Sequence, residues 1–103
     1  GYNHLKIQIT IFMNKEQLVA KIAEKASVTK KEANQILDAT IEIVVDTVVE
    51  GEKLTLVGFG TFEARERKER QGRNPQTGEV ITIAATRVPV FSPGKLFKDK
   101  VAE

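Results

Sequence analysis

A dense run of cations occupies residues 65–75, where five of the eleven side chains are Arg or Lys and the last residue is Pro75. Two glutamates in the run leave a local charge of +3. Such a density of guanidinium and ammonium groups can neutralise phosphates or other anions. Residues of strand character flank the run at 61–62 and 80–83. The pattern predicts a long basic β-hairpin with a turn at 74–78. Because an isolated two-stranded ribbon is marginal in water, the hairpin is also expected to bind an anionic partner.

The cations fall on both faces of the predicted hairpin. Arg65 and Arg67 share one face of a strand, and Lys68 and Arg70 share the other. Cations on both faces suit an arm that runs through a groove between two walls of phosphate. An exposed Pro75 at the end of such an arm suits insertion between base pairs. The alternative is a hairpin that is kept soluble by its charge.

The residues needed for catalysis or metal binding are sparse. His4 is the only histidine and cysteine is absent, so the chain has neither a thiol nucleophile nor a disulfide. Asp38, Asp46 and Asp99 lack the spacing of a metal site or of a catalytic carboxylate pair. The GxG at 58–60 lacks a third glycine and a following helix, which favours a tight turn. We therefore expect no enzyme activity, metal or cofactor.

Size and charge favour an anionic partner and a second protein chain. The 103 residues suffice for one small domain, and a net charge of +2 with a pI of about 9.0 conceals acidic residues concentrated in 16–52. Because the arm contributes little core, a partner chain is expected to complete the hydrophobic centre. Trp is absent and Tyr occurs once, so the stacking surface of single-strand binders is missing. No apolar run approaches the ~18 residues of a membrane span.

Two helices are expected before the hairpin. Asn14 with Gln17, and Thr29 with Glu32, have the spacing of capping boxes that open helices. The β-branched run at 41–49 locally favours a strand, but the cap, the length and the spaced acidic residues favour a long second helix ending near Gly51. A helix-turn-helix reader of the major groove is disfavoured because this helix is largely acidic or apolar.

Strands and a last helix follow. Residues 53–57 and 61–64 predict strands around the 58–60 turn, and the hairpin returns through 80–87. Ser92 is expected to cap the last helix, with Pro93 at its first position and the helix running from 95 to about 102. The predicted fold class is α+β: an N-terminal helical hairpin, a three-stranded antiparallel sheet with a long β-ribbon arm, and a short C-terminal helix.

Residues 1–12 stand apart from the rest of the chain. Leu5, Ile7, Ile9 and Ile11 alternate with polar residues before Met13 opens a sequence of different character. We expect residues 1–12 to be a non-native or upstream extension, the alternative being an added edge strand. Residues 13–103 are then expected to form one domain, with an arm over about 65–87.

From Met13 to Ala102 the chain resembles the HU/IHF family of bacterial histone-like DNA-bending proteins, and HU more closely. Four stretches carry the resemblance, at 13–15, 56–62, 72–78 and 88–95. The glycine–phenylalanine turn and the Arg-Asn-Pro tip at this separation are specific to it. The family is itself one of the examples from which minor-groove binding with apolar wedges was described.

The resemblance implies an intertwined homodimer whose two arms reach around DNA in the minor groove, with Pro75 intercalating. It implies a cytoplasmic protein that compacts and organises the nucleoid. The residues expected to bind DNA are Lys15, Arg65, Arg67, Lys68, Arg70, Arg73, Asn74, Pro75, Arg87, Lys95 and Lys98. The residues expected in the dimer core are Ile41, Val44, Val48, Phe59, Phe62 and Phe91.

The expected partner is double-stranded DNA, bound with little sequence preference and better when nicked, gapped or bent, because deformation then costs less. A sequence-selective IHF-like protein is the main alternative, and a heterodimer with a paralogue is a further option. An RNA chaperone and a module that grips an acidic protein remain open from the residues alone.

Overall fold

A computed structural model describes residues 11–103, so the expectations for residues 1–10 lie outside the described residues. Ile11 and Phe12 are exposed and have no regular structure. Contacts divide the chain into two units, Gly1–Thr40 and Ile41–Glu103, and the division falls within the second helix.

Both predicted capping boxes are confirmed. α1 (Lys15–Ala26) begins at Asn14, whose Oδ1 accepts from the Gln17 N–H at 2.8 Å, while the Gln17 Oε1 accepts from the Asn14 N–H at 2.9 Å. α2 (Lys30–Val49) begins in the same way, because Thr29 and Glu32 exchange bonds of 2.9 and 3.0 Å. These reciprocal bonds satisfy N–H groups that a helix start leaves without partners.

The first unit has a small core. Val19, Ala23 and Ala33 are buried, and three further side chains pack partly buried against them: Ile22, Val28 and Leu37. In the second unit, α2 stays helical through its β-branched residues to Val49, as predicted, and the Gly51 N–H donates to the Val48 carbonyl at 3.0 Å.

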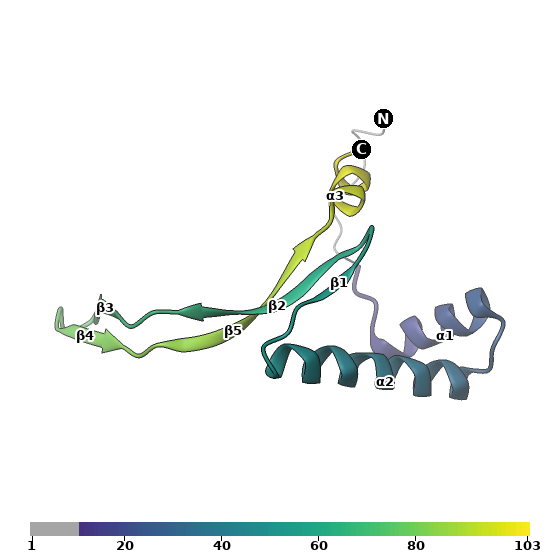
Figure 1. Cartoon of the computed structure of the whole chain (residues 1–103), viewed down its shortest axis with the longest axis horizontal. Helices are drawn as coiled ribbons and strands as arrows, with labels where there is room; N and C mark the ends of the chain where they lie inside the picture. Colours follow the sequence, from purple (N-terminus) through teal and green to yellow (C-terminus); the bar gives the residue numbers. More distant parts are fainter. Residues whose placement is uncertain (1–10) are drawn as a thin grey trace. The chain divides into compact units, whose positions relative to one another are not determined.

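The predicted sheet and arm lie in the second unit (Figure 1). β1 (Leu54–Leu56), β2 (Gly60–Arg67) and β5 (Thr86–Pro93) form an antiparallel sheet in the order β1-β2-β5. β3 (Arg70–Arg73) and β4 (Val80–Ile83) form a separate two-stranded ribbon that continues the arm to its tip. The α+β class is thereby confirmed.

The arm is interrupted where a continuous hairpin was expected. Pairing stops at 68–69 on the outgoing side and at 84–85 on the return, between the pairs Arg67↔Thr86 and Arg70↔Ile83. Lys, Glu and Ala, which occupy the gap, are depleted in strands. The predicted single return strand at 80–87 is therefore wrong in this detail, and Lys68 and Arg70 do not share one strand.

The prediction that Ser92 caps the last helix with Pro93 at its first position is wrong. Both residues belong to β5 and pair with Thr61 and Gly60, and α3 (Lys95–Ala102) begins after Gly94 without a side-chain cap. The strand pairing outcompetes the local capping signal, and Pro93 lies on β5, an edge strand of the sheet, where a missing N–H is tolerated.

Glycine closes the turn between β1 and β2. Gly58 has a φ of +87°, which favours glycine, and confirms the predicted turn. A Cβ on Gly60 would lie 2.5 Å from the Phe91 ring of the neighbouring strand. The absence of a side chain there lets the Phe91 ring lie against the β2 backbone.

Candidate nucleic-acid interface

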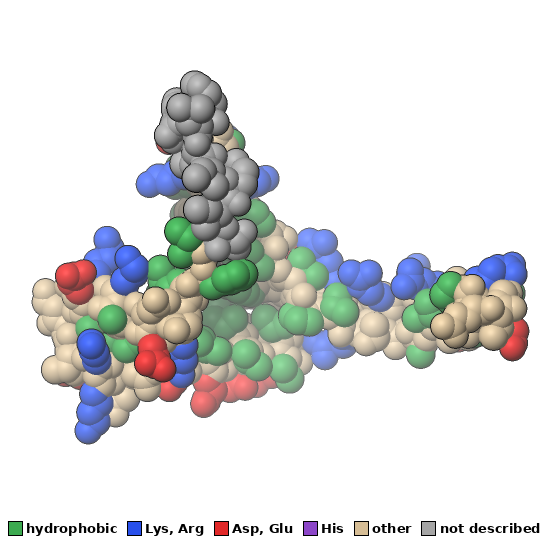
Figure 2. All heavy atoms as spheres, turned by 180° about the vertical axis from the view of Figure 1, so that it is seen from behind, with side chains coloured by type: hydrophobic (Ala, Val, Ile, Leu, Met, Phe, Trp, Pro, Cys, Tyr) green, Lys and Arg blue, Asp and Glu red, His purple; other side chains and the backbone are tan. Residues whose placement is uncertain are grey.

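The arm carries the predicted cations as exposed side chains. Arg65 and Arg67 lie on β2, Lys68 lies in the interruption, and Arg70 and Arg73 lie on β3. Lys and Arg side chains follow one another along the arm in Figure 2. Because the arm is narrow and these groups are exposed, they can face a polyanion that lies along it.

The arm cations differ in whether they form ion pairs or hydrogen bonds within the protein. The Arg65 Nη2 lies 3.5 Å from a Glu63 carboxylate oxygen and 3.4 Å from the Ser92 hydroxyl, at the root of the arm. Among the described residues, the side chains of Arg67, Lys68 and Arg70 make neither ion pairs nor hydrogen bonds. The outer part of the arm is thus the part most ready to bind an anion.

Pro75 is exposed at the far end of the arm, in the turn that joins β3 to β4. Asn74 precedes it and is half-buried, because its side chain bonds the backbone of the turn. An apolar ring on an exposed turn has the shape of a wedge.

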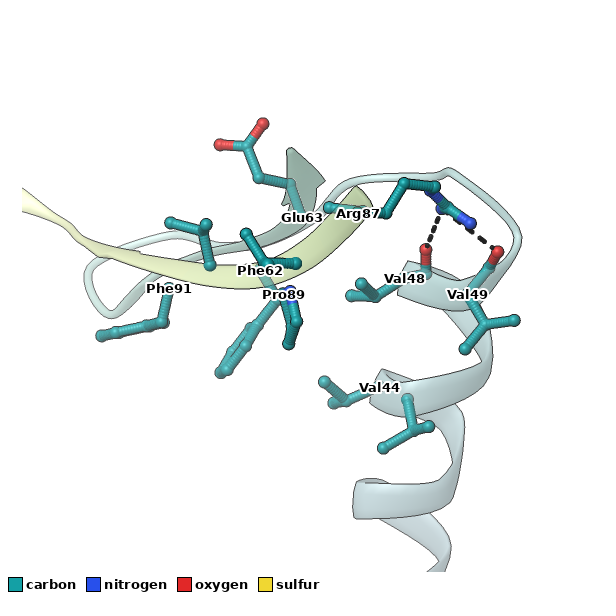
Figure 3. Close-up of a pocket in the computed structure, with 12 residues that line it drawn as sticks. Val44, Val48, Val49, Phe62, Glu63, Arg87, Pro89 and Phe91 are labelled. Atoms are coloured by element: carbon teal, nitrogen blue, oxygen red, sulfur yellow. Dashed lines mark hydrogen bonds between the residues drawn. The ribbon is translucent and has the colours of Figure 1, made fainter. Parts of the chain in front are cut away.

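Arg87 lies on β5 at the root of the arm and bonds the end of α2 (Figure 3). Its Nη2 donates to the Val48 and Val49 carbonyls, each at 3.3 Å. The last carbonyls of a helix lack partners within it and carry its partial negative charge, so a guanidinium stabilises them. Sequence reasoning missed this bond because residues 48 and 87 are far apart along the chain.

The other predicted body contacts are lysines at helix starts and along α3. Lys95 opens α3 and pairs with Asp99 at 2.7 Å, and Lys98 lies on the same helix. Lys15 belongs to the first unit and pairs with Asp38 at 2.6 Å. These lysines are exposed, and the two pairs are worth little in water.

The aromatic residues predicted for the dimer core gather in the second unit. Phe59 lies 5.2 Å from Phe91 and 6.2 Å from Phe62 between ring centroids. Phe97 of α3 stacks on Phe59 at 5.5 Å with an interplanar angle of 13°. Phe97 was not among the predicted core residues, although its place on the apolar side of the last helix was the signal. Phe59, Phe91 and Phe97 all remain partly exposed.

The apolar side chains of α2 and the sheet leave a hollow of about 420 Å³. Phe62 and Phe91 line it together with Val44 and Val48 of α2 (Figure 3). Ile41, which was also predicted for the core, is exposed, as are Ile43 at 61% and Val57 at 98%. Exposed apolar side chains in this number are typical of interaction surfaces.

Among residues 11–103, no group of three or more His, Cys, Asp or Glu side chains is placed to hold a metal ion. None of the helices in this range is both long and apolar enough to cross a bilayer.

Comparison with known proteins places this geometry in a family. The family model described as "Bacterial DNA-binding protein" matches residues 13–102. The DNA-binding protein HU of Nostoc sp. (strain PCC 7120) is 61% identical over 90 residues, which cover 87% of this chain and 96% of the relative. The DNA-binding protein HU of Clostridium pasteurianum is 60% identical over 89 residues, with 86% and 98% covered.

Solved structures agree with the sequence relatives. The cocrystal structure of Anabaena HU with DNA matches with a TM-score of 0.82 and 61% identity, covering 87% of this chain and 98% of that one. HU from Thermotoga maritima matches with a TM-score of 0.61 and 34% identity, covering 86% and 98%. These similarities favour HU over the IHF-like alternative.

Proposed function

Because the chain belongs to the bacterial DNA-binding protein family, over residues 13–102, we propose that it is an HU-type histone-like protein. It binds double-stranded DNA without sequence specificity and bends it. The observation that carries this function is the basic arm with an exposed proline at its end, on a fold shared with an HU protein solved on DNA.

The outer arm supplies most of the affinity in this proposal. Arg67, Lys68 and Arg70 are exposed and free of ion pairs among the described residues. Each phosphate that they neutralise releases condensed counterions, so affinity falls steeply as salt rises. Arg73 and Asn74 extend the contact toward the tip. Lys15, Arg87, Lys95 and Lys98 are proposed to meet flanking phosphates once the DNA bends.

Pro75 supplies the bend. A ring inserted between two base pairs of the minor groove partly unstacks them and kinks the duplex, at a cost of roughly a few kcal/mol. The contacts of flanking DNA with the protein offset that cost. Nicked, gapped or bent DNA is then expected to bind better, because less deformation is needed.

The protein acts as an intertwined homodimer. Apolar side chains of α2 and the phenylalanine cluster are exposed in the single chain. A second copy can bury them, because it presents the same apolar surface. Two copies also supply two arms, and so two wedges on one duplex. A heterodimer with a paralogue would use the same surface.

The proposed cellular role is to compact and organise DNA in the cytoplasmic nucleoid. The arm offers charge and a wedge rather than a set of side chains arranged for base edges, which predicts little sequence preference. A protein with these properties can bind throughout a chromosome.

A random-sequence duplex labelled with a dye at each end tests the function. We expect saturable binding that draws the ends together, weakens with salt and is indifferent to sequence. Binding without approach of the ends would remove the wedge and leave DNA as the partner. Absence of binding at low salt would overturn the proposal as a whole.

A further inference from the structure

The three-stranded sheet has a polar face, and a carboxylate lies on its central strand. Side chains alternate along a strand, so Glu63 and Arg65 of β2 share the face opposite Phe62. Figure 3 shows the Glu63 side chain pointing away from Phe62 and Phe91. The polar face continues along β2 into the root of the arm. An acidic group therefore lies where the proposed DNA path meets the body of the protein.

The Glu63 carboxylate forms ion pairs with two cations. Its Oε1 lies 3.7 Å from the Nζ of Lys53, just before β1, and its Oε2 lies 3.5 Å from the Nη2 of Arg65. The same Arg65 nitrogen lies 3.4 Å from the Ser92 hydroxyl on β5. The Glu63 side chain is only 17% exposed, whereas those of Lys53 and Arg65 are 71% and 58% exposed. A partly buried carboxylate thus holds two exposed cations at the root of the arm.

Glu63 differs in this respect from the other acidic residues of the outgoing arm. Glu66 and Glu69 are exposed and form no ion pair among the described residues, so water and salt screen them. The partners of Glu63, by contrast, are cations that a DNA phosphate can also bind. If both cations turn to phosphates, a carboxylate with little access to water is left without partners, which costs free energy. Phosphate binding at the root is therefore coupled to the loss of these two ion pairs.

We propose that Glu63 limits the affinity for DNA, because it holds Lys53 and Arg65 in the free protein and competes with phosphates for them. This inference rests on the proposed function. It adds Lys53, which was not among the predicted DNA-binding residues, as a phosphate ligand. A carboxylate that has lost both partners takes up a cation from solution, which cancels part of the counterion release on binding. Binding is then weaker and less dependent on salt than the arm cations alone would make it.

Two glutamine variants separate this competition from a simple change of net charge. Glu63→Gln removes the carboxylate charge and keeps the size of the side chain. Glu66→Gln is the matched control, because it makes the same charge change three residues along the same strand, at a glutamate without an ion pair among the described residues. Both variants should keep the wild-type unfolding midpoint, since ion pairs to exposed cations add little to stability.

The first measurement is the affinity for a random-sequence duplex over a range of salt concentrations. Glu63→Gln should bind roughly two- to tenfold more tightly than wild type, the range expected for two such ion pairs. Its slope of log affinity against log salt should be steeper by roughly one. Glu66→Gln should gain less affinity and keep the wild-type slope. Equal changes in the two variants would mean that net charge alone acts, and would overturn the proposal.

The second measurement repeats the titration with Lys53→Gln in two backgrounds. In the Glu63→Gln background Lys53 is free for phosphate, so its removal should lower the salt slope by roughly one. In wild type the same change should lower the slope less, because Glu63 holds the ammonium group. The same effect in both backgrounds would show that the two sites are independent and that Glu63 does not withhold Lys53.

Retention on immobilised heparin, a polyanion without base pairs, distinguishes this inference from the proposed function. Glu63→Gln should elute at higher salt than Glu66→Gln, because two further cations become available to the polyanion. If wild type neither binds nor bends duplex DNA but the two variants still elute in this order, the proposed function fails and the competition by Glu63 stands. Elution of both variants at the same salt would overturn the competition, whether or not the protein binds DNA.

Discussion

The tip of the arm and the apolar surface of the second unit differ in how far a single chain satisfies them. The tip turn satisfies its backbone through bonds among neighbours in the chain, with the Asn74 side chain at its centre. The phenylalanine cluster, by contrast, stays partly open to water, with Phe59 44% exposed. The tip turn thus finds its hydrogen-bond partners within a single chain, whereas the phenylalanine cluster is not buried within one.

The difference follows from the range of the forces involved. Side-chain to backbone hydrogen bonds form between residues two or three apart, so a short turn can be complete in itself. Hydrophobic stabilisation grows with the apolar area removed from water. A short chain in which part of the length forms an arm can bury only a small apolar area by itself. The backbone of the tip turn therefore finds its bonds within one chain, whereas the exposed phenylalanine cluster is expected to be covered by a second copy.

Removal of a ring from the apolar cluster should have the largest effect. Phe59 contacts Phe62, Phe91 and Phe97, so Phe59→Ala should cost about 3–5 kcal/mol in the free energy of unfolding and abolish the dimer. Chemical denaturation and sedimentation measure the two effects. Val80→Ala on the arm is the control, expected within about 0.5 kcal/mol of wild type. A stable, dimeric Phe59→Ala would place the core elsewhere.

Loss of the wedge should change bending with little change in stability. Pro75→Ala keeps the arm cations, so much of the salt-dependent affinity should persist, while the bend decreases by at least about 20°, the lower end of wedge-induced kinks. The end-to-end dye distance at saturation measures this. The same bend from wild type and variant would show that Pro75 does not intercalate.

Two arginines sharpen the comparison between the outer arm and its root. Arg67→Gln should lower the slope of log affinity against log salt by roughly one for each phosphate that the side chain no longer neutralises. Arg87→Gln should change that slope less and lower stability more, by about 0.3–1 kcal/mol, because its Nη2 bonds the α2 carbonyls. Salt titrations and thermal unfolding of both variants measure this. The reverse ranking would make Arg87 chiefly a phosphate ligand.

Local signals allowed much of this structure to be predicted from sequence. Asn14, Gln17, Thr29 and Glu32 act on neighbours three residues away, and both capping boxes are present. The prediction for Ser92 failed because pairing with β2, which lies far earlier in the chain, outweighed a local cap.

Interactions between distant elements had no local signal. Arg87 bonds two α2 carbonyls that lie 38 and 39 positions before it in the chain. The stacking of Phe97 on Phe59 joins a helix to a turn. The tip network was missed for a different reason. The Asn-Pro pair indicated a turn, but it did not show that the Asn74 side-chain oxygen would accept hydrogen bonds from the backbone of that turn.

The smallest expected effect concerns the start of α2, far along the chain from the arm. The Glu32 carboxylate accepts from the Thr29 backbone N–H at 2.9 Å. This bond, and after it the Thr29 side chain, lowers the pKa of Glu32 from the ordinary value of 4.5. A lowered pKa in the folded state means that this contribution to stability is present above the unfolded pKa and is lost as pH falls through the folded value.

Glu32→Gln isolates this contribution, because glutamine can still accept from the Thr29 N–H but does not titrate. Wild type should unfold at a slightly higher temperature than Glu32→Gln at about pH 7, and the gap should close as the pH falls below about 4.5. Glu24→Gln is the control, since the Glu24 side chain makes no bond among the described residues. A gap that persists at about pH 3 would mean that glutamine disrupts the cap itself, and that the carboxylate charge is not what stabilises this helix start.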